Sequence, residues 1–405
     1  MTELSAHDMA HGGEAVARLD GKAVFVAGVI PGERVEASIT KDGGSWARAD
    51  LDEILEASPD RVSPPCPHFV DCGGCQWQYL DYHAQLRWKS KTVAAQLAHL
   101  GGLGDVAVRD TLPSSRPYAY RNRMDFHVTG GQPALHRSRS HDLVPLGECH
   151  LLIPRLADLF SRLGPLDEVQ QITLRAGEAT GDQMVVIRGA VPKQAEEWDV
   201  HVARVRRGRP VAEFGRSHLF EEVAGNRYRI TANAFFQNNT EGAAQLVELV
   251  REALDPRSED VVLDGYAGGG LFSVALADSV DEVVAVETSP LGLADLEHNL
   301  EAAGAFAAIV PVPFEEAASE VDFWDVAVVD PPRTGLGPAG IETVTSAAPR
   351  AIALVSCDPA ALARDAKGLT EAGYELDWVA PVDLFPQTYH IETVSRFVKN
   401  DLNSL

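Results

Sequence analysis

The sequence predicts an α/β protein in which a small N-terminal β-barrel and a central α+β region precede a C-terminal doubly wound parallel sheet. Short apolar and polar alternations fill the first sixty positions, and strand-like runs between turn signals occupy the middle. From Val261 onward, apolar strands alternate with amphipathic helical stretches. Since 405 residues are too many for one compact core, we expect domains at 1–60, 61–230 and 231–405.

The barrel is expected from short alternating runs at residues 22–26 and 34–39, which are separated by Pro-Gly and Asp-Gly-Gly turn signals. A Ser-Pro-Pro junction at residues 63–65 follows. A helix is then expected from about Tyr82 to Leu100, where a glycine-rich stretch stops it.

The central region contains strand-like runs at residues 124–128, 171–174 and 184–187, each bounded by turn signals. Runs of this kind indicate an antiparallel α+β region.

The C-terminal sheet is expected from four apolar runs, at residues 261–263, 283–286, 326–329 and 351–355. Ligands of such sheets bind beyond the carboxyl ends of the strands. The residues that follow each run are therefore the first candidates for a functional site.

The chain carries a formal net charge of −24, which opposes RNA binding because neutralised phosphates supply much of that affinity. The charge is uneven, since residues 61–140 contain ten Lys or Arg against five Asp or Glu. Residues 231–405 contain eight against twenty-nine. No apolar run approaches the ~20 residues of a membrane span and the start is polar, so we expect a cytoplasmic protein with no membrane partner.

Four of the five cysteines indicate a metal or cluster site rather than a disulfide framework. Cys66, Cys72 and Cys75 follow a C-x5-C-x2-C spacing, and Cys149 is a distant fourth thiol. Four thiolates suit either zinc or an iron-sulfur cluster, and the spacing does not choose between them.

A glycine-rich turn, Asp264 to Gly270, follows the first strand of the C-terminal sheet and allows backbone to approach a ligand closely. The turn lacks the glycine spacing of a dinucleotide-binding loop, and it also lacks the lysine of a phosphate-binding loop. Glu287 closes the second strand, where a carboxylate can accept two ribose hydroxyls. The pattern indicates an adenosyl ligand, with a degenerate Rossmann-like site as the alternative.

Reactive groups follow the later strands. Asp330 precedes Pro-Pro-Arg, and the two prolines hold its carboxylate at the strand end. Cys357, in Ser-Cys-Asp-Pro, leaves the next strand on the same side and is a candidate nucleophile. Glu392, in His-Ile-Glu, precedes a final strand at residues 393–398 and can bring a carboxylate into the same cleft.

In this order, together with Phe-Phe-Gln-Asn-Asn at residues 235–239, these motifs resemble the RNA uracil-C5 methyltransferase family over nearly the whole chain. The resemblance implies a Rossmann-like S-adenosylmethionine methyltransferase domain and an OB-type, TRAM-like RNA-binding barrel. It also implies the iron-sulfur branch, with a 4Fe-4S cluster on the four cysteines.

Site roles implied by the resemblance cover six residues. The nucleophile is Cys357 and the base is Glu392, while the cofactor contacts are Gln237, Tyr266, Glu287 and Asp330. The family loop often has Cys and Asn where this chain has Ala267 and Leu271, so one cofactor contact is lost or replaced.

The chemistry expected is formation of 5-methyluridine. Addition of a thiolate to C6 of uracil makes C5 nucleophilic, and a base then removes the C5 proton. The target uridine must be unstacked, so flipped-out or loop positions are the natural substrates. Basic and aromatic residues at 118–123 and 136–139 are candidates for holding the RNA strand, with a solvated surface as the alternative.

Three rival functions stay open. One is an exocyclic-amine methyltransferase, which needs no thiol; another is an RNA-binding or redox-sensing protein with an inactive methyltransferase domain. A cytosine-C5 enzyme is disfavoured because it places a second Cys beside the proline turn, and residues 331–333 are Pro-Pro-Arg. The expected partner is RNA rather than DNA, with 23S rRNA favoured over tRNA, and we expect a monomer.

Overall fold

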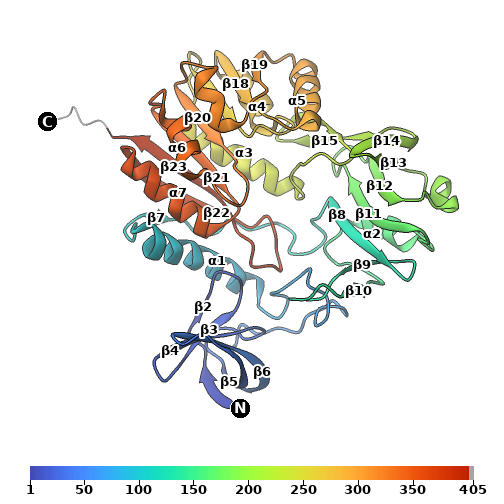
Figure 1. Ribbon diagram of the computed structural model, residues 1–405, viewed down its shortest axis with the longest axis vertical. Helices are drawn as coiled ribbons and strands as arrows, with labels where there is room; N and C mark the ends of the chain where they lie inside the picture. Colours follow the sequence, from blue (N-terminus) through green and yellow to red (C-terminus); the bar gives the residue numbers. More distant parts are fainter. Residues whose placement is uncertain (401–405) are drawn as a thin grey trace.

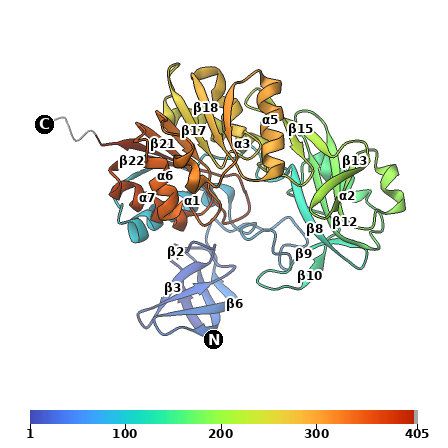
Figure 2. The ribbon, with the colours of Figure 1, turned by 45° about the horizontal axis from the view of Figure 1, so that its top comes forward.

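The computed structural model describes residues 1–400, arranged in three bodies. A small β-rich body lies at the bottom of Figure 1, a β-sheet body lies to the right, and a larger α/β body lies above. Figure 2 shows the N-terminal body below the α/β body, and Arg139 of the central body also donates to Glu14 of the N-terminal body at 2.7 Å. The predicted fold class is confirmed in all three parts.

The N-terminal body is a six-stranded sheet in the order β1-β5-β6-β4-β3-β2. Its strands are β1 (Thr2–Ser5), β2 (Asp8–Met9), β3 (Ala15–Leu19), β4 (Lys22–Val26), β5 (Arg34–Asp42) and β6 (Trp46–Glu56). Alternate residues point inward, so Val24 and Val26 of β4 meet Val35 and Ala37 of β5 in one core. This packing explains why apolar and polar residues alternate in the first sixty positions of the sequence.

The central body is a seven-stranded sheet in the order β10-β9-β8-β11-β12-β13-β14. Its elements are β8 (Arg123–Thr129), β9 (Gln132–His136), β10 (Leu143–Pro145), α2 (Pro154–Ser161), β11 (Val169–Ala176), β12 (Gln183–Gly189), β13 (His201–Arg206) and β14 (Arg209–Phe214). The sheet is antiparallel except where β12 pairs with β13. A hairpin of β15 (His218–Val223) and β16 (Asn226–Thr231) leads into the α/β body.

The α/β body contains an eight-stranded sheet in the order β19-β18-β17-β20-β21-β23-β22-β7. Its strands are β7 (Ala107–Val108), β17 (Val261–Gly265), β18 (Glu282–Val286), β19 (Ala307–Val310), β20 (Val326–Val329), β21 (Ala351–Ser356), β22 (Tyr374–Val382) and β23 (Glu392–Lys399). Strands β17 to β21 are parallel, as expected. The last strand differs, because β22 returns through a short loop into β23, which must run antiparallel to it and to β21.

Helices cover both faces of this sheet. One face packs against α3 (Thr240–Leu254), α4 (Leu271–Leu276) and α5 (Pro290–Ala303). The other packs against α1 (Tyr82–Gln96), α6 (Gly337–Thr345) and α7 (Pro359–Glu371). The strands between are buried on both sides, which explains their continuous apolar runs.

One helix and one strand of the α/β body come from far upstream in the chain. Helix α1 ends in a single π-helical turn at Leu97–Gly101, where the sequence indicated a stop, and its Val93 packs into the α7 side of the core. Strand β7 then pairs parallel to β22, with Ala107 opposite Trp378. The α/β body is therefore completed by residues that precede the central sheet.

Candidate active site

Three reactive side chains meet at one edge of the α/β sheet. Asp330 follows β20, Cys357 follows the neighbouring β21, and Glu392 is the first residue of β23. Because β23 runs antiparallel to β21, its first residue lies at the edge where the parallel strands end. The sheet topology thus brings the expected nucleophile, the expected base and the proline-turn carboxylate to the same place.

The thiol and the base lie in a common electrostatic environment. The pKa of Cys357 is raised to about 12, mainly by burial and in smaller part by the Glu392 and Asp330 carboxyls, while Arg333 opposes the shift. Burial also raises the pKa of Glu392 well above its ordinary value, with Asp330 adding to the shift. Glu392 is 4% exposed, and this burial disfavours the ionised form of its carboxyl.

A further carboxyl, that of Asp264, lies beside Asp330 of this group. Burial raises the pKa of Asp264 to about 7, and burial together with Asp264 does the same for Asp330. The Asp264 Oδ2 accepts a 2.5 Å hydrogen bond from Ser273, while its Oδ1 is buried with no partner in residues 1–400. The unpartnered oxygen and the surplus of negative groups fit a cationic ligand.

The glycine-rich loop after β17 makes a tight turn, with positive φ angles at Tyr266, Gly268 and Gly270. Tyr266 adopts a left-handed φ of 64°, unusual for a residue with a side chain, and its ring packs on Phe314 at 4.8 Å between centroids. The Gly268 amide donates to Glu287 at 2.7 Å. A Cβ on Gly268 would meet nothing closer than 4.0 Å, so the space above the loop is free for a ligand.

Gln237 lies just before α3 and is buried. Its main-chain carbonyl accepts from Asn122 of the central body at 3.3 Å. No hydrogen bond in the described part of the chain joins its side chain to Tyr266, Glu287 or Asp330. The two residues that depart from the family loop, Ala267 and Leu271, both pack in the core.

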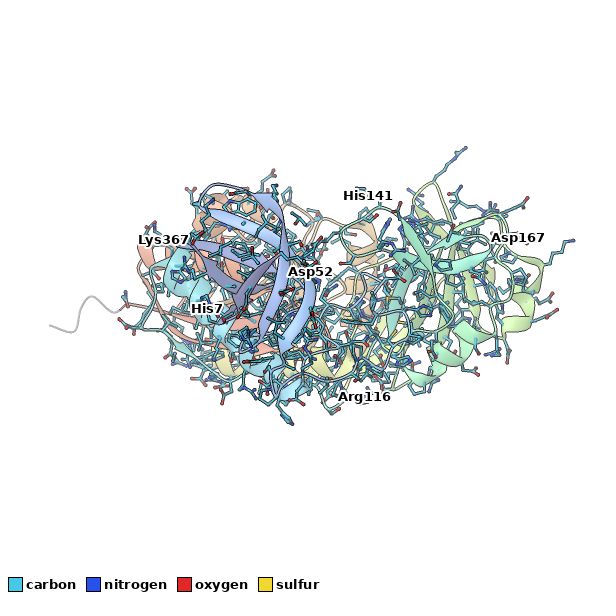
Figure 3. All side chains as sticks on the ribbon, turned by 90° about the horizontal axis from the view of Figure 1, so that it is seen from below. His7, Asp52, Arg116, His141, Asp167 and Lys367 are labelled. Carbon is cyan, nitrogen blue, oxygen red and sulfur yellow. The ribbon has the colours of Figure 1, made fainter. Side chains whose placement is uncertain are left out.

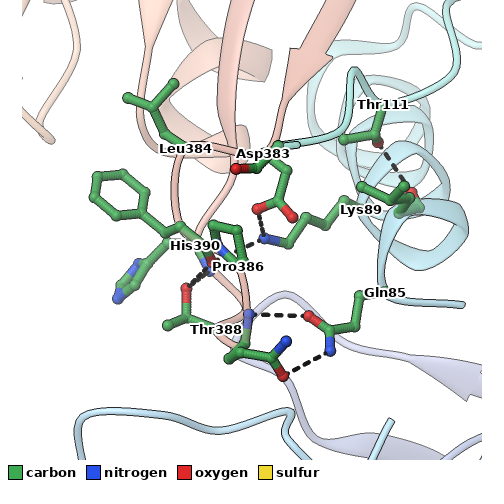
Figure 4. A network of polar contacts seen from close by, with 12 residues as sticks. Gln85, Lys89, Thr111, Asp383, Leu384, Pro386, Thr388 and His390 are labelled. Carbon is green, nitrogen blue, oxygen red and sulfur yellow. Dashed lines mark hydrogen bonds and ion pairs between the residues drawn. The ribbon is translucent and has the colours of Figure 1, made fainter. Parts of the chain in front are cut away.

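A buried polar network fixes the loop between β22 and β23, which delivers Glu392. The Lys89 ammonium of α1 lies 2.5 Å from the Asp383 carboxylate, both fully buried, and donates to the Phe385 carbonyl at 3.2 Å (Figure 4). Below them the Gln387 main-chain N–H donates to the Gln85 Oε1 at 3.0 Å, and the Gln85 Nε2 donates to the Gln387 Oε1 at 3.0 Å. Helix α1 therefore clamps this loop from outside the C-terminal region.

The four other cysteines line one cavity between residues 66–78, which precede α1, and the central body. Burial raises the pKa of Cys75 to about 12 and of Cys149 to about 11. The Gly74 amide donates to the Cys72 sulfur at 3.4 Å. All five cysteines, including Cys66, are free, and no group of three or more His, Cys, Asp or Glu among residues 1–400 could hold a metal ion.

Several residues around the site were not assigned from the sequence. Arg333 and Asp264 were inside recognised motifs but had no assigned role, and Lys89 carried no local signal. Tyr120, a candidate for RNA contact, is instead buried, and its hydroxyl donates to the Pro386 carbonyl at 3.0 Å. It holds the loop that delivers Glu392 rather than a strand of RNA.

Comparison with known proteins identifies two regions. Residues 194–312 and 317–399 match the model of the tRNA (uracil-5-)-methyltransferases, and residues 2–51 match the TRAM domain. An uncharacterised RNA methyltransferase of Streptomyces avermitilis is 36% identical, with 97% of each chain covered. Another, of Halalkalibacterium halodurans, is 32% identical and covers 98% of this chain and 96% of its own.

The structure of Pyrococcus abyssi tRNA (uracil-54, C5)-methyltransferase with S-adenosyl-L-homocysteine is similar to this one, with a TM-score of 0.78. The two are 26% identical, and the match covers 98% of this chain and 99% of that one. Within residues 1–400, no helix is long and apolar enough to cross a membrane.

Proposed function

Since the chain belongs to the tRNA (uracil-5-)-methyltransferase family, we propose that it forms 5-methyluridine in structured RNA through a covalent bond between Cys357 and C6 of the target uracil. The observation that carries the proposal is the meeting of Cys357, Glu392 and Asp330 at one sheet edge. We further propose that it acts as a cytoplasmic monomer.

The methyl donor of this fold is S-adenosylmethionine, which supplies an electrophilic methyl group. We propose that Gln237, Tyr266, Glu287 and Asp330 hold it. The open space above Gly268 and the unpartnered oxygen of Asp264 support this, because the ligand is cationic and needs both room and negative charge.

The covalent step needs a thiolate, yet burial keeps the Cys357 thiol protonated at neutral pH. The Glu392 and Asp330 carboxyls face it, and Asp330, whose pKa burial and Asp264 raise to about 7, accepts the thiol proton, so that Glu392 stays free for the later step. The sulfur then bonds to C6, and the C5–C6 π electrons make C5 nucleophilic.

The second half of the reaction restores the uracil ring. Once C5 carries the methyl group, Glu392 removes the C5 proton, the C5–C6 double bond re-forms and the bond from C6 to the Cys357 sulfur breaks. The net change is replacement of hydrogen by methyl at C5. Glu392 is buried, which shields the proton transfer from water and raises the pKa of its carboxyl, so that it holds the C5 proton once it has accepted it.

For the four remaining cysteines we propose a 4Fe-4S cluster with a structural role. The four thiols lining one cavity, and the amide that donates to the Cys72 sulfur, support it. Iron and sulfide analysis of anaerobically purified protein, with zinc measured alongside, tests it.

We favour 23S rRNA as the substrate, with tRNA as the alternative. The favoured assignment depends on the cluster cysteines, while the similar solved structure is, by its title, a tRNA enzyme. RNA from cells that lack 5-methyluridine separates the two, because the labelled species is identified by its size and sequence.

The test compares methyl transfer from labelled S-adenosylmethionine by the wild type, Cys357→Ala and Glu392→Gln. We expect 5-methyluridine from the wild type alone, and a protein–RNA adduct that survives denaturation with Glu392→Gln. Glu375→Gln, an exposed glutamate on β22, is the matched control and stays active. Methylation of an exocyclic amine, or an active Cys357→Ala variant, contradicts the proposal.

A further inference from the structure

The N-terminal barrel reaches the catalytic strand edge through the loop that joins β2 and β3, residues 10–14. Its His11 Nε2 lies 3.1 Å from Oδ2 of Asp358, 347 residues further along the chain. Asp358 directly follows Cys357. Since a carboxylate only accepts, the His11 Nε2 carries the hydrogen and donates it. A residue of the barrel thus touches the neighbour of the nucleophile.

The loop that carries His11 is held by hydrogen bonds and by close packing of its glycine. Ala10 and Glu14 close a tight turn, with the Gly13 amide donating to the Ala10 carbonyl at 3.0 Å. The Gly13 carbonyl accepts from the Trp77 indole at 3.2 Å. Gly13 has a φ of 81°, and a Cβ there would lie 2.9 Å from Trp77 and 3.0 Å from Tyr389, so no larger residue fits. The loop therefore packs directly against Tyr389, in the segment that leads to Glu392.

The two carboxylate oxygens of Asp358 accept hydrogen bonds from different bodies of the molecule. Oδ1 caps α7 by accepting from the Ala360 and Ala361 amides at 2.9 and 2.8 Å, while Oδ2 accepts from His11. The hydrogen bond from His11 is the main cause that lowers the pKa of Asp358 to about 2, so the carboxylate is ionised at neutral pH. Ser356 closes the turn from the other side, its hydroxyl donating to the Asp358 carbonyl at 3.2 Å.

We propose that His11 is a positioning residue for the nucleophile, acting through Asp358 to hold the Cys357 turn in the geometry for attack on C6. The proposal rests on the proposed function, in which Cys357 is the nucleophile. It makes the barrel part of the catalytic apparatus in addition to any contact that it makes with RNA. Loss of the contact leaves the turn held only by the α7 amides and by Ser356.

The kinetic test compares His11→Ala and His11→Gln with the matched control His7→Ala. Gln retains an N–H donor at a similar reach, and His7 is an exposed histidine of the same barrel, labelled in Figure 3. We expect His11→Ala to lower kcat about 10- to 100-fold with KM for RNA within about twofold, because small misplacements of a reacting atom are costly. His11→Gln recovers most of the rate, and His7→Ala is unchanged.

A second measurement needs no RNA. With the other four cysteines as cluster ligands, Cys357 is the thiol open to alkylation, and we expect His11→Ala to raise its alkylation rate severalfold as the turn loosens. This result separates failure of the positioning role from failure of the proposed function. A raised KM with unchanged kcat, a His11→Gln variant as slow as His11→Ala, or an unchanged alkylation rate each overturns the proposal.

Discussion

Replacing Lys89 by Met tests the buried clamp on the loop that delivers Glu392. The Lys89 and Asp383 side chains are both fully buried and 2.5 Å apart, and the Asp383 Oδ2 has no partner among the described residues. Removing the ammonium therefore leaves a buried carboxylate with neither oxygen paired. Breaking one side of such a pair costs about 3–5 kcal/mol. That is a large part of the ~5–15 kcal/mol by which a domain is stable.

Urea unfolding followed by tryptophan fluorescence measures this loss, since the Trp77 ring lies 5.9 Å from the Lys89 ammonium. Lys91→Met, an exposed lysine on the same helix, is the matched control and changes stability by about 0.5 kcal/mol or less. The double variant Lys89→Met with Asp383→Leu recovers most of the loss, because no charge stays buried. A single variant within about 1 kcal/mol of the wild type, or a double variant no better than the single one, refutes the reasoning.

Three further outcomes are expected. Asp264→Asn stabilises the ligand-free protein at pH 8 but not at pH 4 in thermal melts, because a carboxyl whose folded pKa is raised to about 7 costs stability as pH rises through that value. Arg333→Met moves the pH profile of kcat to higher pH, since Arg333 lowers the pKa of Cys357. Gly265→Ala lowers the free energy of unfolding by about 1–3 kcal/mol, because its Cβ would lie 2.4 Å from the Phe314 ring. The same clash displaces the loop that is proposed to hold S-adenosylmethionine, so KM for that ligand rises.

Four of the five parallel strands were predicted because strands buried on both faces are continuous apolar runs. The fifth, β19, was missed since its alanine-rich residues are half-buried. Strand β22 was missed because Asp377 and Pro381 interrupt its pattern. The antiparallel direction of β23 depends on the connection from β22, and the hydrophobic pattern of a strand carries no information on its direction.

The candidate site was predictable where it depended on strand ends. Cys357, Asp330 and Glu392 each stand beside a recognisable strand, so topology alone brings them together. The supports were not predictable, because Lys89 and Asp383 are 294 residues apart and neither lies in a motif. His11 and Asp358 are separated by 347 residues, and only the folded chain joins them.

The completion of the α/β sheet by β7 has a consequence for the order in which the protein folds during its synthesis. Ala107 leaves the ribosome 271 residues before its partner Trp378. At ~5–20 residues per second, the interval is about 14 to 54 seconds. Throughout it the apolar side of α1, including Val93, has no core to enter. We expect the nascent chain to depend on chaperones over this interval, and the catalytic body to close only when the last strand has emerged.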